Sequence, residues 1–276
     1  MHQDETDWIP FIDAPWSADQ KEQFDFILQW RLALQQLTPA ESEASLLKSV
    51  FEAEADRLMA GEATSLLPKT IVDNMKLRTE RDGLPLEWFV SQVRVAHRYY
   101  HPMQFATGKE LKEFLTASVV AQGKLIAKLA DVAHGWQLPQ VSDLATAFHL
   151  VDKLVNLPAE LKSGRLYIPL SDLEQAGVTV DEIEQGVVDA RTQKLLWKQI
   201  IRIRDAFAQG QPLVKEIPRK FRRTFKKNWL TGLELVGEIE RRQYDLWSEP
   251  IVLTKIQKFQ IAVLSIIGKG AAKARG

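Results

Sequence analysis

The chain contains no cysteine, and this absence excludes disulfide bonds, thiolate metal sites and cysteine nucleophiles together. Neither sign of charge is in excess, because 36 acidic residues balance 36 basic ones, so only a local patch can attract a charged partner. The longest apolar run, residues 261–268, is far shorter than the roughly 20 residues of a membrane-spanning helix. The acidic N-terminus also lacks the features of a signal peptide. We expect a cytoplasmic protein, soluble or attached peripherally at the inner face of the membrane.

Hydrophobic residues make up 45% of the 276 residues, which is enough to form a substantial core. They recur at helical spacing, and almost no segment shows the strict alternation of a strand. We predict an all-α protein of about ten helices that forms one domain over residues 1–276. Ser17 is the expected N-cap of the first helix, and the later helices are expected at 40–59, 65–81, 86–100, 108–132, 141–157, 180–208, 218–246 and 253–267.

The most informative segment is residues 150–178. Its first half places Asp152, Asn156 and Glu160 at intervals of four. Its second half reads Gly-Arg-x-Tyr-x-Pro and then Asp-Leu-x-x-x-Gly-Val, and the defined positions are Gly164, Arg165, Tyr167, Pro169, Asp172, Leu173, Gly177 and Val178. This segment resembles the second aspartate-rich motif and the following turn of the squalene/phytoene synthase family.

Three further segments resemble that family in the same order. Residues 119–129 resemble its glycine-containing cavity helix, with Gly123 at the second glycine and Lys128 in place of an arginine. Residues 51–61 resemble the helix after its first aspartate motif, and residues 232–255 resemble its C-terminal motif. The resemblance implies an isoprenoid synthase-like helical bundle around a central cavity. It suggests five cavity or ligand-binding residues: Gly123, Lys128, Arg165, Tyr167 and Tyr244.

Both metal-binding motifs of that family are altered here. In the family, Mg²⁺ held between the two motifs binds the diphosphate leaving group during the joining of two allylic diphosphates. Mg²⁺ prefers anionic oxygen ligands, which amide side chains do not supply. The altered positions are Gln35 and Gln36 in the first motif, by our alignment, and Asp152, Asn156 and Glu160 in the second. We therefore assign no catalytic residue and expect no cofactor.

Two alternatives keep a metal. Asp152 and Glu160 are weak candidates for a remaining site, because their spacing would place them on one face of an unbroken helix. Pro158 interrupts that face, so we favour a solvated polar surface. In the other alternative, the chain is an active farnesyl or geranylgeranyl diphosphate transferase whose Mg²⁺ is held by these residues and by other acids such as Glu41.

The densest positive charge lies in residues 215–227, which contain seven basic residues and one acid. This segment is either a solvated helix end or a contact for anionic lipid headgroups, reinforced by the amphipathic residues 251–267 and by a basic tail. No nucleic-acid-binding motif accompanies it, so we expect no nucleic acid as a partner. The expected membrane-contact residues are Lys220, Arg222, Arg223, Lys226 and Lys227.

The resemblance favours a family member that has lost Mg²⁺-dependent condensation and serves as an isoprenoid- or lipid-binding or assembly protein at the membrane. Some relatives without these carboxylates act in respiratory-complex assembly, which implies a protein partner that the sequence does not identify. A carrier that holds a prenyl chain without reacting it is a third hypothesis.

Overall fold

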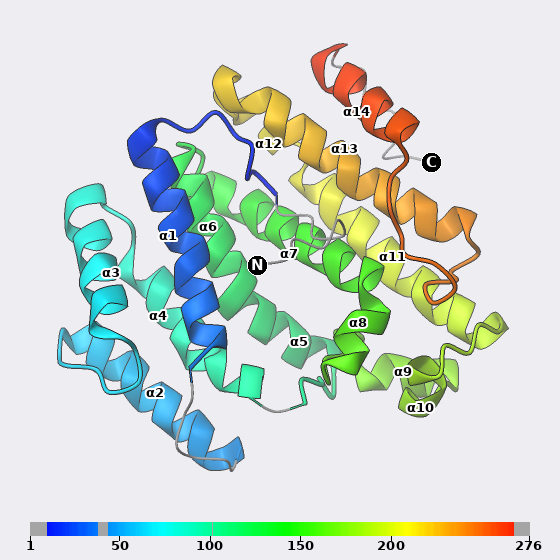
Figure 1. The fold of residues 1–276 in the computed structure, drawn as a ribbon, viewed down its shortest axis with the longest axis horizontal. Coiled ribbons are helices and arrows are strands. Elements are labelled where there is room, and N and C mark those ends of the chain that lie inside the picture. Colours follow the sequence, from blue (N-terminus) through cyan, green and yellow to red (C-terminus); the bar gives the residue numbers. More distant parts are fainter. Residues whose placement is uncertain (1–9, 38–43, 101, 268–276) are drawn as a thin grey trace. The chain divides into compact units, whose positions relative to one another are not determined.

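The computed structural model describes residues 10–37, 44–100 and 102–267, and this part of the chain contains helices and connecting segments but no strand (Figure 1). The all-α prediction is confirmed. The α-helices are α1 (Ala18–Gln35), α2 (Ala44–Ala60), α3 (Lys69–Asp82), α4 (Leu86–Val95), α5 (Gly108–Leu115), α6 (Ala121–Leu129), α7 (Leu138–Val155), α8 (Leu157–Lys162), α9 (Leu170–Ala176), α10 (Val180–Glu184), α11 (Ala190–Gly210), α12 (Leu213–Glu216), α13 (Arg219–Arg241) and α14 (Lys255–Ile267). Two short 3₁₀ segments, η1 (Ala96–Tyr100) and η3 (Gly135–Gln137), and a π-helical segment, η2 (Thr116–Val120), complete the list.

The chain folds into two compact units. The first is formed by residues 16–103 and 112–142, and the second, within the described residues, by 10–15, 104–111 and 143–267. The single domain expected over 1–276 stays a prediction. In the part of the chain that is described, no helix has the length and apolar character needed to cross a membrane.

In the first unit, α1 and α4 meet through large aromatic side chains. Ser17 caps α1, as expected, in a capping box with Gln20. The ring of Phe89 on α4 lies 5.9 Å from that of Phe26 and 5.3 Å from that of Trp30, both on α1 and both buried. These contacts anchor the helix at whose C-terminal end Gln35 and Gln36 lie.

In the second unit, residues 143–155 of α7 pack against α11. The rings of Phe148 and Phe207 meet edge to face at 5.3 Å. Gly210, the last residue of α11, allows a close approach, since a Cβ there would lie 2.3 Å from Cγ of Leu144. The absence of a side chain at Gly210 is therefore required by packing.

One predicted helix begins later than expected. The helix predicted at 65–81 begins at Lys69, because the buried Glu54 carboxylate accepts hydrogen bonds from the backbone N–H groups of Ser65 and Leu66 at 3.0 and 2.9 Å. This local alternative holds the preceding residues outside the helix. For the helix predicted at 40–59, residues 40–43 lie outside the described residues, and α2 ends at Ala60.

The helix predicted at 180–208 is wrong in its continuity. It is split into α10 and α11 at Gly186, whose φ is +71°, and Asp189 then caps α11 by accepting from the N–H groups of Arg191 and Thr192. The helix predicted at 218–246 ends at Arg241, because Gln243 and Tyr244 both adopt the left-handed conformation. The break after α13 places Tyr244 in a turn.

Candidate functional site

Asp152, Asn156 and Glu160, the residues expected at the second motif, lie at the junction of α7 and α8. Asn156 lies between the two helices, and Pro158 lies in the first turn of α8, so the predicted interruption of the helix is confirmed. The break is small, because the Glu160 N–H still donates to the Asn156 carbonyl at 3.0 Å. The carboxylates of Asp152 and Glu160 therefore remain about two helical turns apart.

Lys153 lies between these two carboxylates. Its Nζ is 3.0 Å from Oδ2 of Asp152 and 2.7 Å from Oε1 of Glu160. Arg165 adds a second cation, with its Nε 2.5 Å from Oε2 of Glu160. Asn156 donates from Nδ2 to Oδ1 of Asp152 at 3.1 Å. Every one of these oxygen atoms thus has a donor from within residues 152–165.

The charges around Glu160 decide its ionisation. Burial alone would raise the pKa of this carboxyl, but the nearby Lys153 and Arg165 outweigh burial and hold the pKa below its ordinary value. Glu160 is 6% exposed, so the carboxylate is kept ionised by protein cations rather than by water.

The donor set does not fit Mg²⁺. A magnesium ion needs free anionic oxygens in near-octahedral geometry, whereas Asp152 and Glu160 already bind Lys153 and Arg165. No group of three or more His, Asp or Glu side chains suited to a metal ion occurs among the residues that the structure describes. The weak candidates Asp152 and Glu160 are therefore brought together, but as partners of cations.

Tyr167, one of the five suggested ligand-binding residues, also belongs to this cluster. Its buried ring meets that of His149 edge to face at 5.1 Å, and Nζ of Lys153 lies 5.9 Å from its centroid. Arg165 and Tyr167 thus both contact the altered motif.

The other suggested positions lie elsewhere. Gln35 and Gln36 are exposed at the C-terminal end of α1, while α6 carries a half-buried Gly123 and an exposed Lys128. Tyr244 follows α13, and burial together with the charge of Glu240 raises its pKa. A role of these residues in ligand binding stays a prediction.

Asp172, from the second half of the motif, is a buried anchor between α9 and α11. It accepts from Lys198 at 3.0 Å, from Gln199 at 3.2 Å and from both terminal nitrogens of Arg202. Burial would raise its pKa, but these donors lower it overall. Asp172 therefore links α9 to α11 through buried hydrogen bonds and ion pairs.

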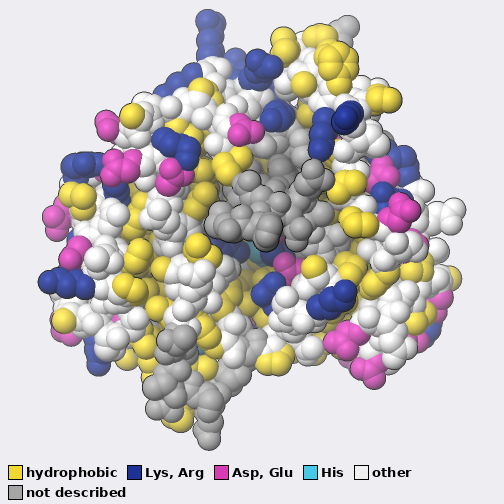
Figure 2. All heavy atoms as spheres, in the orientation of Figure 1, with side chains coloured by type: hydrophobic (Ala, Val, Ile, Leu, Met, Phe, Trp, Pro, Cys, Tyr) yellow, Lys and Arg dark blue, Asp and Glu magenta, His cyan; other side chains and the backbone are white. Residues whose placement is uncertain are grey.

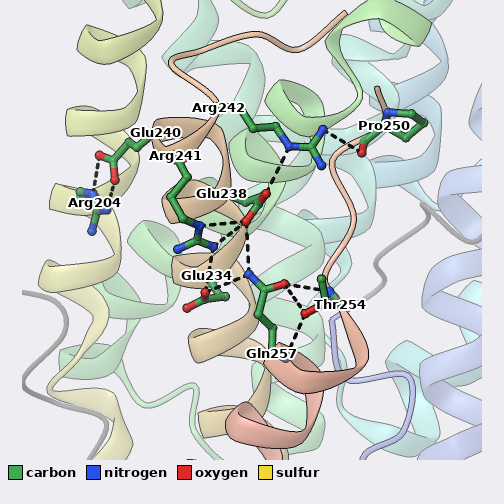
Figure 3. A network of polar contacts seen from close by, with 9 residues as sticks. All are labelled: Arg204, Glu234, Glu238, Glu240, Arg241, Arg242, Pro250, Thr254 and Gln257. Carbon is green, nitrogen blue, oxygen red and sulfur yellow. Dashed lines mark hydrogen bonds and ion pairs between the residues drawn. The ribbon is translucent and has the colours of Figure 1, made fainter. Parts of the chain in front are cut away.

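A groove of about 450 Å³ lies between α13 and α14 and is bordered by Arg204 of α11. One part is apolar and includes Leu230, Leu233 and Ile261, while the polar part holds the ion pair between Arg204 and Glu240. Figure 3 shows the polar network in which Arg241 pairs with Glu234 and Glu238, and Gln257 of α14 reaches the same two carboxylates. None of the suggested ligand-binding residues lines this groove.

The basic residues expected at the membrane differ in their surroundings. Arg222 is half-buried and donates to the carbonyls of Lys215 and Ile217 at 3.3 and 3.1 Å, so it fastens α13 to the segment before it. Lys227 is exposed and lies 3.5 Å from Asp13. Nζ of Lys220 lies 4.5 Å from the centroid of the Phe221 ring.

The sequence interpretation overlooked Lys153. Its position is readable, because it follows Asp152 directly and precedes Glu160 by seven residues, two helical turns along the same face. A lysine at that spacing between two acids indicates an internal ion pair.

Comparison with known proteins identifies the family of the chain. The family model described as "Squalene/phytoene synthase" matches residues 32–259, and the chain belongs to that family. The 15-cis-phytoene synthase of Synechococcus elongatus is 21% identical over 209 residues, which cover 71% of this chain and 67% of that protein. Phytoene synthase 1 of Zea mays is 28% identical over 115 residues, which cover 42% of this chain but only 28% of the maize protein.

Solved structures share the fold. A squalene synthase, HpnC, from Alicyclobacillus acidocaldarius matches with a TM-score of 0.68 at 21% identity, over 82% of this chain and 85% of that one. A dehydrosqualene synthase in complex with ligand matches with a TM-score of 0.71 at 12% identity, over 92% of this chain and 88% of that one. The chain therefore has the all-α isoprenoid synthase-like fold of these structures.

Proposed function

We propose that this member of the squalene/phytoene synthase family does not carry out Mg²⁺-dependent condensation of prenyl diphosphates and acts as a binding or assembly protein at a membrane. The observation that carries the proposal is the position of Lys153 between Asp152 and Glu160. A lysine ammonium there neutralises the negative charge that these carboxylates would otherwise offer to a metal ion. Unlike a metal ion, the ammonium has no open coordination position for a phosphate oxygen.

The first motif supports the same proposal. Gln35 and Gln36 are neutral and exposed at the end of α1, so they add no negative charge there. Without charge at one motif and with internal pairing at the other, the chain lacks the field that stabilises several divalent ions beside a diphosphate.

An active prenyl diphosphate transferase with rearranged ligands is the rival. One observation favours it: Glu160 stays ionised in a buried place. An active transferase would need Asp152 and Glu160 to exchange their lysine and arginine partners for a metal ion when substrate binds. Glu41, the further acid suggested for this arrangement, lies outside the described residues.

An activity assay decides between the non-catalytic protein and the active transferase. The purified protein is incubated with farnesyl and geranylgeranyl diphosphates and Mg²⁺, with or without NADPH. We expect no pyrophosphate release and no hydrocarbon product from a sample whose helical circular dichroism shows that it is folded. An active dehydrosqualene synthase, assayed in parallel, confirms that the substrates and detection work.

Turnover that disappears in Glu160→Gln and Asp152→Asn would overturn the proposal and establish the rearranged site. The amide variants keep the size of the side chains and should therefore fold. Circular dichroism verifies this before their activities are compared. Glu174→Gln, at an exposed position of α9, is the matched control and should behave as the parent protein.

A further inference from the structure

The outer face of α14 is apolar and exposed. Ile256 and Phe259 are each 70% exposed, and Ile266 and Ile267 are 63% and 59% exposed. Their spacing of three, seven and one residues places them on one side of the helix. Figure 2 shows hydrophobic side chains gathered over α14, next to lysine and arginine side chains. A continuous apolar stripe of this kind indicates an interaction surface.

The opposite face of α14 fixes how that stripe is presented. Ile261 and Ser265 are buried on the side that packs against α13. At the N-terminal end, Thr254 and Gln257 exchange backbone and side-chain hydrogen bonds in a capping box, and Gln257 donates to Glu234 and Glu238 at 3.2 Å each (Figure 3). The rotation of the helix about its axis is therefore set by the protein. A helix on a protein surface needs only one apolar face, so the outer stripe is not explained by packing.

The outer helix itself carries charge of one sign. Within the described residues 251–267, Lys255 and Lys258 are basic and no residue is acidic. On α13, Arg223 and Lys227 precede Leu230 by seven and three residues, so they continue the face of that helix that borders the groove against α14. Positive charge thus accompanies the apolar stripe on α14, and the acids of α13 that reach α14, Glu234 and Glu238, are paired with Arg241.

We propose that the outer face of α14 docks into the surface of an anionic phospholipid bilayer. Phe259 and the isoleucines enter the boundary between headgroups and acyl chains, and Lys255 and Lys258 contact lipid phosphates. This inference rests on the membrane part of the proposed function and identifies its surface and lipid class. It does not depend on whether diphosphates are turned over.

The dimensions favour a helix that lies in the interface. With 13 residues, α14 is about 20 Å long, shorter than the roughly 30 Å of a bilayer core. A second copy of the chain is a poorer occupant, because a symmetric contact through this face would bring the two sets of lysines together. Arg222 is not part of this surface, since its guanidinium binds backbone carbonyls.

The test is flotation of the full chain with vesicles of phosphatidylcholine that contain about a third phosphatidylglycerol, compared with phosphatidylcholine alone. We expect at least roughly tenfold tighter binding to the anionic vesicles. The double variant Phe259→Glu/Ile266→Glu should lower that binding by roughly tenfold or more, because both carboxylates would enter the lipid boundary. Lys255→Glu/Lys258→Glu should remove the preference for anionic lipid. Trp136→Glu, at a position 62% exposed in the other unit, is the matched control and should bind as the parent chain does.

Three results would overturn the proposal: no binding of the parent chain to anionic vesicles, unchanged binding of the Phe259→Glu/Ile266→Glu variant, or a dimer in vesicle-free solution that this variant abolishes. The altered side chains are exposed, so circular dichroism should show each variant folded. Pyrophosphate release, measured on the same samples, separates the two proposals. Vesicle binding together with turnover contradicts the non-catalytic part of the proposed function. If the protein neither binds vesicles nor turns over diphosphates, the docking surface and the membrane part are contradicted and the non-catalytic part stands.

Discussion

Nζ of Lys153 lies 2.7 Å from Oε1 of Glu160, so the acid that ends the altered motif is neutralised by a lysine seven residues earlier in the chain. The same ammonium lies 3.0 Å from Asp152. Asp152, Lys153, Glu160 and Arg165 therefore form an internal ion-pair cluster, in which Arg165 is the second cation.

Replacement of this lysine tests that description. Lys153→Gln should lower the free energy of unfolding by about 1–2 kcal/mol, because it leaves two carboxylates close together with one cation fewer. It should also create a weak response to Mg²⁺, seen as a rise in Tm with millimolar Mg²⁺ that the parent protein lacks. Lys198→Gln removes a comparable partner from Asp172 and should show no such response. A Mg²⁺-dependent rise in Tm of the parent protein would contradict this account.

Asp172 should be among the most sensitive positions of the second unit. Asp172→Asn should cost about 2–4 kcal/mol of unfolding free energy, because Arg202 and Lys198 lose their buried anionic acceptor. Urea denaturation measures the loss. Glu174→Gln, two residues later and exposed, should stay within about 0.5 kcal/mol of the parent. Equal effects of the two substitutions would argue against an anchoring role.

Stability should fall in acid. The pKa of Glu160 and that of Asp172 are both lowered in the folded protein, so near pH 4 the unfolded chain binds more protons than the folded one. Their contribution is complete above about pH 5 and is lost as the pH falls through the lowered folded values. Urea midpoints between about pH 5 and pH 2 should therefore decrease, and less steeply in the Glu160→Gln/Asp172→Asn variant. An unchanged slope in that variant would show that other carboxylates cause the acid sensitivity.

Gly210 should not tolerate a methyl group. In Gly210→Ala the new Cβ would lie 2.3 Å from Cγ and 2.6 Å from Cδ2 of Leu144, which predicts a loss of about 1–3 kcal/mol from overpacking. Adding Leu144→Ala removes the clash, so the double variant should lose less than the sum of the two single losses. Gly237→Ala is the control, since its Cβ would meet nothing closer than a terminal nitrogen of Arg241 at 3.4 Å. Additive losses in the double-mutant cycle would refute the predicted contact.

The sequence by itself determined the features that depend on neighbouring residues. Helical periodicity predicted an all-α chain, and the Ser17 cap was identified correctly. Pro158 was correctly expected to interrupt the helix, which breaks between α7 and α8. The motif at residues 164–178 indicated the family that the comparison confirms. These signals are local, because caps, helix breaks and motif spacing are set within a turn or two of the backbone.

Tertiary structure decided what the charged and apolar side chains do. Nothing in the local pattern shows that Asp172 meets Arg202, 30 residues later, or that Glu54 holds the backbone before α3. Periodicity marks α14 as amphipathic but does not say which face packs on α13 and which remains exposed. The free energy of an ion pair or an apolar surface depends on what surrounds it, and that environment exists only once distant helices have packed together.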